Sequence, residues 1–386
     1  MKSAMTFDVA VIGLGGIGSS VAAACAERGL STVGIERFAP SHHRGSSHGQ
    51  TRLIRETYYA HQSYVPLVRR SFEKWRELER ETSEALLTIS GALYIGKSEA
   101  SSIAGVRASA QSNGIALIEV DEQSRRRRFP TLRIRSDEAV LFEPGAGYIH
   151  PESAVRAFTE RAIGFGARLM YGAHVADTSA RDEQRVCRIT LLDGTVISAG
   201  AIVLCLGPWL TNALAALFPD VYASRVVQAW FEPARDGFET NAFPSFSIER
   251  AELPGILYGF PDSGRGVKAA FHNSGKRTDP DALDTTVTSE ETGAIASALD
   301  DVMPGAAGKL RAASACMYTM TPDEHFILGS IPERPGVFVA GGCSGHGFKF
   351  CPVLGEIVAD LVEHGTTRYD IGLFSPTRFQ ERSPLC

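Results

Sequence analysis

The sequence lacks the marks of a membrane, zinc-binding or secreted protein. No apolar run approaches the ~20 residues that a helix needs to cross a bilayer, so we expect no membrane partner. The seven cysteines are scattered, odd in number and without a C-x-x-C pair, which is typical of a reducing compartment. The ten histidines show no H-E-x-x-H or similar ligand spacing, so we expect no metal site.

The chain also lacks a basic excess. Its 39 Lys and Arg residues are outnumbered by 44 Asp and Glu residues, so we expect no nucleic acid partner. The only dense basic block, residues 125–128, is typical of a solvated loop or helix end. An apolar strand is expected from residue 7, which leaves too little room before it for a signal peptide. We therefore expect a cytoplasmic protein, and 386 residues suit two domains.

Residues 7–36 carry the most informative pattern that is present. An apolar run meets Gly-Leu-Gly-Gly-Ile-Gly, and a helix-period segment is followed by a second strand that ends at Glu36. Gly13 permits a tight turn, Gly15 lets the backbone approach a pyrophosphate, and Gly18 lets helix and strand pack closely. The helix N-terminus would point N–H groups at the phosphates, and Glu36 can accept hydrogen bonds from a ribose. The pattern predicts a dinucleotide site; an ordinary βαβ turn is the alternative.

The rest of the chain alternates helical and strand patterns. Apolar residues recur at three- and four-residue steps in segments that predict helices, at 64–81, 104–112, 152–165, 288–303 and 353–363. Short apolar or β-branched runs predict strands, at 92–95, 168–175, 188–192, 201–207 and 337–342. A β-rich stretch, residues 221–275, interrupts the alternation. The sequence therefore predicts an α/β nucleotide domain, built from non-contiguous pieces, and a β-rich second domain.

Five further segments carry a resemblance to known proteins, at residues 48–55, 258–261, 268–272, 316–326 and 344–350. They read H-G-Q-T-R-L-I-R, Y-G-F-P, K-A-A-F-H, C-M-Y followed by D-E-H-F, and S-G-H-G-F-K-F. Over essentially its whole length the chain resembles the monomeric sarcosine oxidase and N-methyltryptophan oxidase group. That group belongs to the FAD-dependent amine oxidases, which include D-amino acid and glycine oxidases.

The resemblance implies FAD rather than NAD, and a monomer. The implied reaction oxidises the C–N bond of a secondary amino acid to an imine, while O2 is reduced to hydrogen peroxide. The implied fold has two domains, as in p-hydroxybenzoate hydroxylase. A Rossmann-like FAD-binding domain would comprise residues 5–85, 145–220 and 313–386, and a β-rich substrate domain would comprise residues 86–144 and 221–312.

Cys316 is expected to carry the flavin. In the family the matching cysteine is joined to the flavin 8α-methyl as a thioether, because a thiolate can add to the methide tautomer of the ring. Without the motif, Cys316 would be interpreted as a small buried cysteine. The resemblance places Arg52 over the flavin ring, where it could stabilise negative charge, and His48 beside the ring. The loop that contains Gly345 and His346 is expected to support the pyrimidine edge of the flavin.

Three further cations match functional positions of the family. Arg55 and Lys349, the latter in the flavin-binding loop, would clamp the substrate carboxylate so that the C–H bond faces flavin N5. Lys268 matches the lysine that promotes the reaction of O2, because a fixed cation stabilises developing superoxide. Lysine usually lies at the surface, but the apolar neighbours of Lys268 favour an inward side chain.

His272, Tyr258 and Tyr318 match residues of the substrate pocket. Their imidazole and phenol groups could hydrogen-bond the substrate amine, although Tyr and His are also common core residues. Two positions depart from the family: Ala60 or a neighbour stands where the family has an acid, and residues 246–248 replace a methionine. These departures predict a cavity that has been enlarged or changed in polarity.

Several alternatives stay open on the sequence. The substrate could be N-methyltryptophan, pipecolate, glycine or a fructosyl amino acid rather than sarcosine. A flavin dehydrogenase is a second alternative, against which Lys268 argues. A non-catalytic flavin-binding protein is a third, against which the whole set of cations argues, since a binder needs no oxygen-activating lysine.

Overall fold

A run of parallel strands forms the centre of the half that carries the glycine turn. The computed structural model describes residues 5–382, and in it β1 pairs in parallel with β2 and with β12. The run extends to β9 beyond β2 and to β20 beyond β12. The bounds are β1 (Met5–Ile12), β2 (Thr32–Glu36), β9 (Arg168–Tyr171), β12 (Val196–Leu204) and β20 (Val337–Gly341). The ends of β1, β12 and β20 that carry the loops are buried apolar runs, as is typical of parallel strands covered on both faces.

Three antiparallel strands complete this eight-stranded sheet: β10 (Val175–Thr178), β11 (Cys187–Leu191) and β19 (Ile327–Ser330). The single strand predicted at 168–175 is wrong, because the chain forms β9 and β10 there, at opposite ends of the strand order. Gly172 lies between them at φ +67°, and glycine adopts this left-handed conformation without strain.

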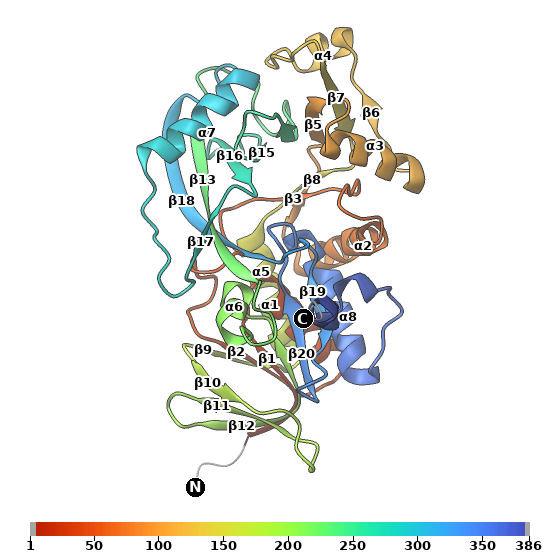
Figure 1. Ribbon diagram of the computed structural model, residues 1–386, viewed down its shortest axis with the longest axis vertical. Helices are drawn as coiled ribbons and strands as arrows, with labels where there is room; N and C mark the ends of the chain where they lie inside the picture. Colours follow the sequence, from red (N-terminus) through yellow and green to blue (C-terminus); the bar gives the residue numbers. More distant parts are fainter. Residues whose placement is uncertain (1–4, 383–386) are drawn as a thin grey trace.

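Helices cover one face of this sheet. α1 contacts both α5 and α8, and α2 contacts α8 (Figure 1). The bounds are α1 (Gly16–Glu27), α2 (Tyr64–Thr82), α5 (Pro151–Gly164) and α8 (Cys351–His364). Their apolar residues share one core, in which Trp75 and Val353 are fully buried. The helices predicted at 64–81, 152–165 and 353–363 are confirmed, with ends moved by one or two residues.

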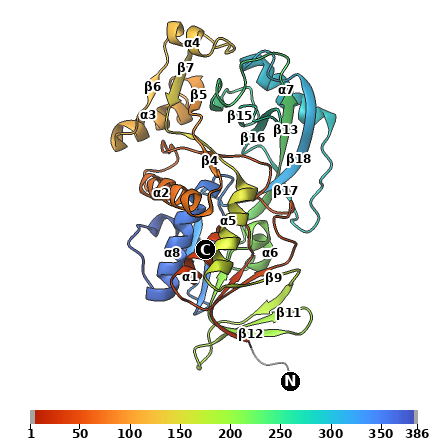
Figure 2. The same ribbon diagram turned by 180° about the vertical axis from the view of Figure 1, so that it is seen from behind.

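A second, nine-stranded sheet lies beyond the first (Figures 1 and 2). Its strand order is β17-β13-β16-β15-β14-β5-β7-β6, and β18 also pairs with β13. The strands are β5 (Ala92–Lys97), β6 (Ile118–Glu119), β7 (Glu138–Glu143), β13 (Tyr222–Glu232), β14 (Ser245–Glu249), β15 (Ile256–Phe260), β16 (Val267–His272), β17 (Lys276–Thr278) and β18 (Lys309–Met320). The accompanying helices are α3 (Ser101–Asn113), α4 (Glu122–Arg128) and α7 (Ser289–Val302).

The two faces of the second sheet differ in chemistry. One face packs on α7, where Phe271 and Leu257 share a core with Leu299. Side chains alternate along a strand, so Lys268 and His272 of β16 lie on the face opposite to Phe271. The alternation therefore keeps the apolar residues under α7 and leaves the polar residues for the face away from it.

A small three-stranded sheet joins the two halves: β3 (Arg52–Ile54), β4 (Leu87–Thr88) and β8 (Gly147–Ile149). β18 also runs from the second sheet down to the first (Figure 1). An α/β half with a parallel sheet and a β-rich half are thus both present, as predicted. The residue limits of the two domains stay a prediction, and Cys386 and the end of the segment 313–386 lie outside the described residues.

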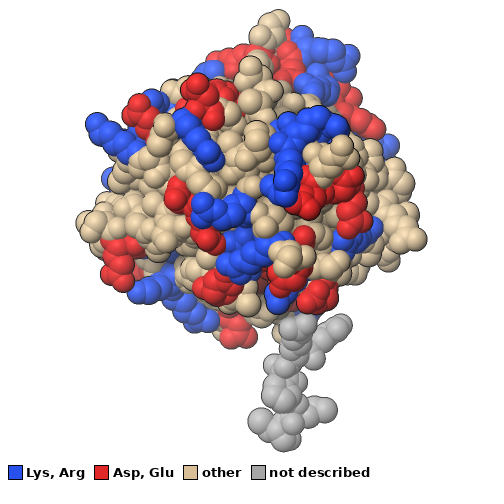
Figure 3. Space-filling view, turned by 90° about the horizontal axis from the view of Figure 1, so that it is seen from above, with Lys and Arg blue, Asp and Glu red and all other residues tan. Residues whose placement is uncertain are grey.

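The surface carries charges of both signs. Over the face in Figure 3, Lys and Arg side chains are interspersed with Asp and Glu side chains. Residues 126–128 are exposed at the C-terminal end of α4, which agrees with the solvated helix end predicted for this basic block. Within residues 5–382 we find no helix of the length and apolarity that crossing a bilayer requires.

Candidate active site

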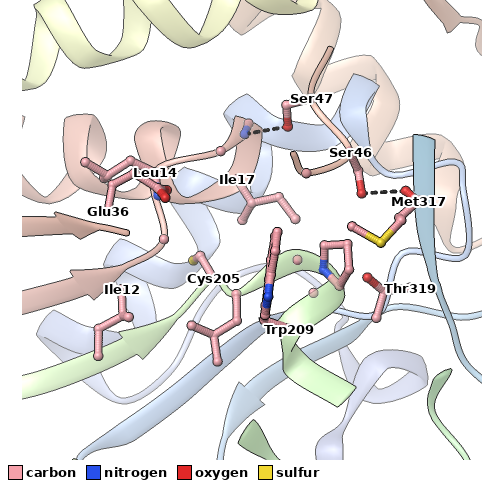
Figure 4. Close-up of a pocket in the computed structure, with 18 of the residues that line it drawn as sticks. Ile12, Leu14, Ile17, Glu36, Ser46, Ser47, Cys205, Trp209, Met317 and Thr319 are labelled. Atoms are coloured by element: carbon pink, nitrogen blue, oxygen red, sulfur yellow. Dashed lines mark hydrogen bonds between the residues drawn. The ribbon is translucent and has the colours of Figure 1, made fainter. Parts of the chain in front are cut away.

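The glycine turn between β1 and α1 has no room for a side chain at two of its three motif glycines, Gly13 and Gly18. Gly13 has φ +90°, and a Cβ atom there would lie 2.4 Å from the carbonyl oxygen of Cys205. A Cβ atom on Gly18 would lie 1.7 Å from the carbonyl oxygen of Gly13. At Gly15 the nearest atom to such a Cβ is the Ser47 hydroxyl, at 3.4 Å. The turn therefore keeps its own side chains away from the N-terminus of α1, where the Ser47 hydroxyl accepts the Gly16 N–H at 3.0 Å (Figure 4), and a phosphate could approach the backbone there.

A cavity of about 460 Å³ lies over this turn. Figure 4 shows it as an elongated space, with Leu14 and Glu36 at one end and Ser46 and Met317 at the other. It is bounded by the ends of β1 and β2 and by the loops that follow β12 and β20. A long cavity that starts at the carboxyl ends of parallel strands fits a dinucleotide.

Glu36 is the buried last residue of β2. Its carboxylate accepts the backbone N–H groups of Leu14, at 2.8 Å, and Phe38, at 3.0 Å, and lies 3.5 Å from Nε2 of His42. Burial by itself would raise the pKa of Glu36, but the hydrogen bonds from His42 and from these two N–H groups lower it. Glu36 is thus held as an anion at the point where a ribose would meet the turn.

Cys316 and Arg52 lie together at the other end of the cavity region. Nη2 of Arg52 is 3.9 Å from the buried Sγ of Cys316. The guanidinium donates to the carbonyl oxygens of Ser46 and Thr51, each at 2.8 Å, and of His48. Arg52 therefore brings a fixed positive charge close to the cysteine sulfur, and its predicted position over the flavin ring stays a prediction.

His48 is a buried, neutral imidazole. Its pKa is lowered to about 4, by burial and by the neighbouring Arg52 charge. Its Nε2 and the hydroxyl of Thr51 have no hydrogen-bond partner among residues 5–382. Buried polar atoms usually have partners, so both atoms fit a ligand bound beside this loop.

Lys268 is inward, and only 2% of it is exposed. Its Nζ donates to the carbonyl oxygens of Gly49, at 2.6 Å, and Thr51, at 3.1 Å. The rings of Trp230 and Phe260 lie 5.3 and 5.2 Å from Nζ. Burial and the Arg52 charge hold the pKa of Lys268 well below its usual value. The lysine thus sits under the same loop that carries His48 and Arg52.

Arg55 follows β3 and is 7% exposed. Its guanidinium lies 4.6 Å from the ring centre of Tyr59 and 5.5 Å from those of Tyr58 and Tyr94. Within the part of the chain that the structure describes, its Nε and Nη1 have no hydrogen-bond partner. A buried guanidinium with free N–H groups is costly unless a ligand supplies the acceptor, so this geometry fits an anionic ligand.

Lys349 also approaches Tyr58, because its Nζ is 5.4 Å from the ring centre of Tyr58. Nζ donates to the carbonyl oxygen of His346 at 2.7 Å. Burial and the Arg55 charge hold the pKa of Lys349 well below its usual value. The carbonyl oxygen of Lys349 accepts hydrogen bonds from Ser71 and Trp75 of α2, which fix this turn. The structure therefore brings the two predicted clamp residues to one tyrosine.

His272, Tyr258 and Tyr318 form one group on the polar face of the second sheet. The hydroxyls of Tyr258 and Tyr318 are 3.1 Å apart, and the His272 ring centre is 5.6 Å from that of Tyr318. The pKa of His272 is lowered to about 4, by burial and by the charges of Arg55 and Lys349. His272 is therefore neutral near pH 7 and lies close to the predicted clamp.

The loop after β20 serves the cavity through its backbone. Gly345 has φ +81°, and a Cβ atom there would lie 2.4 Å from the ring of Tyr318. His346 donates from Nε2 to the carbonyl oxygen of Glu324 at 2.9 Å, so its Nδ1 accepts from the hydroxyl of Tyr58. Both ring nitrogens of His346 are therefore engaged in hydrogen bonds within the protein. Any support for a flavin edge would therefore come from the backbone of this loop.

Sequence reasoning missed Glu143, the buried last residue of β7. Its carboxylate accepts the backbone N–H groups of Glu56, at 2.6 Å, and Thr57, at 3.4 Å, and the hydroxyl of Tyr94, at 2.7 Å. These bonds fix the turn that carries Arg55. The only signal in the sequence is an acid that ends an apolar run before a Pro-Gly turn, which by itself indicates no site.

Comparison with known proteins agrees with this geometry. Residues 8–361 match the protein-family model described as FAD dependent oxidoreductase (DAO). The monomeric sarcosine oxidase of Streptomyces avermitilis is 40% identical, over 97% of this chain and 98% of that protein. The N-methyl-L-tryptophan oxidase of Yersinia pestis (strain Pestoides F) is 32% identical, over 97% of this chain and 100% of that protein. The structure of NikD, an unusual amino acid oxidase essential for nikkomycin biosynthesis, superposes with a TM-score of 0.85 at 24% identity, over 96% of this chain and 98% of that one, which shows a shared fold.

Proposed function

The chain belongs to the family of FAD-dependent oxidoreductases, and we propose that it oxidises N-methyl or other secondary amino acids with O2 as the acceptor. One observation carries this proposal. The buried guanidinium of Arg55 has unpartnered N–H groups, and Lys349 shares the ring of Tyr58 with it. Such a pair of buried cations needs an anion, and a substrate carboxylate supplies it.

The clamp would bind and orient the substrate. Arg55 would donate its free N–H groups to the carboxylate, and Lys349 would add a point charge. Fixing the carboxylate limits the translation and rotation of the substrate in the site, which lowers the entropic cost of the reaction. Because Ser71 and Trp75 hold the Lys349 backbone, the position of the clamp is set by α2 as well as by β3.

The same cations would favour the reactive form of the amine. Arg55 and Lys349 disfavour a third positive charge nearby, so they lower the pKa of the bound ammonium group. Neutral His272 and the hydroxyls of Tyr258 and Tyr318 can then hydrogen-bond the free amine. When bound, FAD supplies the two-electron oxidation of the C–N bond and the reduction of dioxygen to hydrogen peroxide.

Lys268 would serve the oxygen reaction. It is buried beside Arg52, and two carbonyl oxygens fix its Nζ. A fixed ammonium group stabilises negative charge that develops on dioxygen. Its lowered pKa also makes it a better proton donor than an exposed lysine.

Cys316 would anchor the cofactor as a thioether. Its sulfur is buried, and Arg52 lies 3.9 Å away. The thiolate is the nucleophilic form of a cysteine, and the Arg52 charge would stand beside it during attachment. It would also stabilise negative charge on the ring during attachment.

The wall beside Tyr258 favours a substrate larger than sarcosine. In β14, Ser247 pairs with Tyr258 and therefore shares its face, whereas Phe246 and Ile248 point into the core under α7. A small serine thus stands next to the proposed amine site. Ala60, the other departure from the family pattern, is exposed and does not contribute to this wall.

A substrate panel tests the proposal. Hydrogen peroxide release is measured with sarcosine, N-methyl-L-tryptophan, pipecolate, glycine and fructosyl glycine, each against the amine that lacks its carboxylate. We expect kcat/KM to be highest for a secondary amino acid and at least a hundredfold lower for its decarboxylated counterpart. Equal rates for the two would refute the carboxylate clamp, and dye reduction without peroxide would identify a dehydrogenase.

A further inference from the structure

A segment of the second sheet reaches down to the cofactor cavity. Residues 279–288, here called the strap, connect β17 with α7. Figure 1 draws the strap in teal as a long loop that hangs beside β13 and β17 before it returns to α7. The strap thus leaves the substrate-side sheet, approaches the other half of the molecule and comes back.

Asp281 of the strap closes onto two elements of the cofactor half. Its Oδ1 accepts from Nε1 of Trp209 at 2.9 Å and pairs with Nη1 of Arg37 at 2.6 Å. Arg37 directly follows Glu36, and Trp209 ends the short helix η1 (Gly207–Trp209) after β12. Asp281 lines the cavity together with Glu36, Arg37 and Trp209, and Figure 4 shows the Trp209 ring standing in it. A carboxylate from the substrate-side half therefore completes the wall near Glu36.

The two ends of the strap are held very differently. Arg225 of β13 donates to the carbonyl oxygens of Asp284, at 2.7 Å, and Thr286, at 2.6 Å, and pairs with Glu291 at 2.5 Å. At the other end, the side chains of Arg37 and Asp281 are 38% and 46% exposed. Exposed ion pairs are weak and are screened by salt. The strap is thus fixed to the second sheet and only lightly fastened to the cofactor half.

We propose that the strap is a gate over the ribose end of the FAD site and that Asp281 is its latch. FAD enters, and leaves where Cys316 does not hold it, after Asp281 has released Trp209 and Arg37, and the latch forms again over the bound cofactor. The gate acts on the FAD of the family through the contacts of the strap, whichever amine is oxidised.

A gate has a kinetic signature that a simple binding contact lacks. Removing a latch raises the open fraction, so association and dissociation of FAD accelerate by the same factor and Kd stays constant. Removing a contact made only to bound FAD would raise the dissociation rate alone. Loss of one exposed ion pair and one hydrogen bond corresponds to about a tenfold change in the open fraction.

The experiment measures FAD binding to apoprotein by flavin fluorescence, in a Cys316→Ser background so that binding is reversible. Asp281→Ala is expected to raise both rate constants about tenfold. Asp284→Asn is the matched control, because it removes one charge from the same strap without touching Arg37 or Trp209. Trp209→Phe keeps an aromatic side chain but removes the N–H donor to Asp281, and is expected to raise both rates by a smaller factor.

Salt gives a second readout. The FAD association and dissociation rates of Asp281→Ala, divided by those of the control Asp284→Asn, are expected to fall toward one as the NaCl concentration rises. Salt screens the Arg37–Asp281 ion pair, which is still present in the control, and so weakens the latch there. Rates within twofold of the control, or a faster dissociation with unchanged association, would overturn the gate. No substrate is used, so this outcome would leave the proposed amine oxidation untouched, and failure of the substrate panel would leave the gate untouched.

Discussion

Replacing Arg55 tests how the substrate is held. Arg55→Lys keeps the positive charge but loses the planar set of N–H donors, and Arg55→Met loses both. A hydrogen bond to a charged group contributes about 1.5–3 kcal/mol. Arg55→Lys should therefore weaken binding of the amino acid by about 2 kcal/mol, or about thirtyfold. Arg55→Met also leaves the carboxylate without its buried partner, so we expect a loss of about 4 kcal/mol, or about a thousandfold.

The assay compares each amino acid with its decarboxylated amine. Anaerobic flavin reduction is followed by stopped flow, which gives the apparent Kd and the limiting reduction rate. If Arg55 binds the carboxylate, Arg55→Met should abolish most of the preference for the amino acid and leave the weak reduction by the plain amine nearly unchanged. Arg69→Met, which removes an exposed arginine paired with Glu56, is the control and should have no effect on either ligand.

The reasoning is refuted if Arg55→Met slows the amino acid and the plain amine by the same factor. That result would mean that Arg55 supports the fold of the pocket, through the rings of Tyr58, Tyr59 and Tyr94, and makes no contact with the carboxylate.

Four further predictions concern other parts of the site. Lys268→Met should slow reoxidation of the reduced enzyme by O2 far more than reduction by substrate; equal effects in the two half-reactions would exclude its oxygen role. Cys316→Ser should release yellow cofactor on acid or SDS denaturation while the unchanged protein keeps it, and colour lost from both would disprove the thioether. The pKa values of His48 and His272 are about 4 in the folded protein, against 6.5 for the free side chain. Between pH 4 and 6.5 the unfolded chain therefore binds more protons than the folded one, so the free energy of unfolding should fall as the pH drops through this window. Urea unfolding at several pH values should show that fall, and the free energy of unfolding should change less steeply with pH in His272→Gln. An unchanged pH dependence in that variant would contradict the lowered pKa of His272. Gly18→Ala should yield protein without FAD, because a Cβ atom would lie 1.7 Å from a backbone oxygen, and a normal flavin content would count against the turn geometry.

The parts of the fold that local physics dictates could be predicted from the sequence. The glycines at 13, 15 and 18 lie between an apolar strand and a helix-period segment, and that order suffices for the turn. The helix α2 shows apolar residues at helical spacing among charges, and its core residue Trp75 was among them. The prediction of one strand at 168–175 was wrong because Gly172 takes a left-handed conformation there, which ends the first strand. The presence of a glycine in such a run does not by itself indicate that conformation.

The candidate site was predicted in its residue types but not in its construction. The motifs indicated Arg55, Lys349 and Lys268, and the structure buries all three. Their supports come from remote segments: Glu143 fixes the Arg55 turn from 88 positions away along the chain, counted from 143 to 55. The pairing of Asp281 with Trp209 spans 72 positions. Such contacts depend on how the two sheets face each other, and no local pattern encodes that.

The central claim is that this protein draws electrons from a secondary amino acid into its bound FAD. It is tested most directly by mixing the FAD-loaded protein, free of oxygen, with N-alkyl and cyclic amino acids and recording the flavin absorbance. The account predicts that at least one of them bleaches the flavin completely, and that admitting O2 restores the colour with one equivalent of hydrogen peroxide. Unchanged absorbance with every amino acid tried would contradict it.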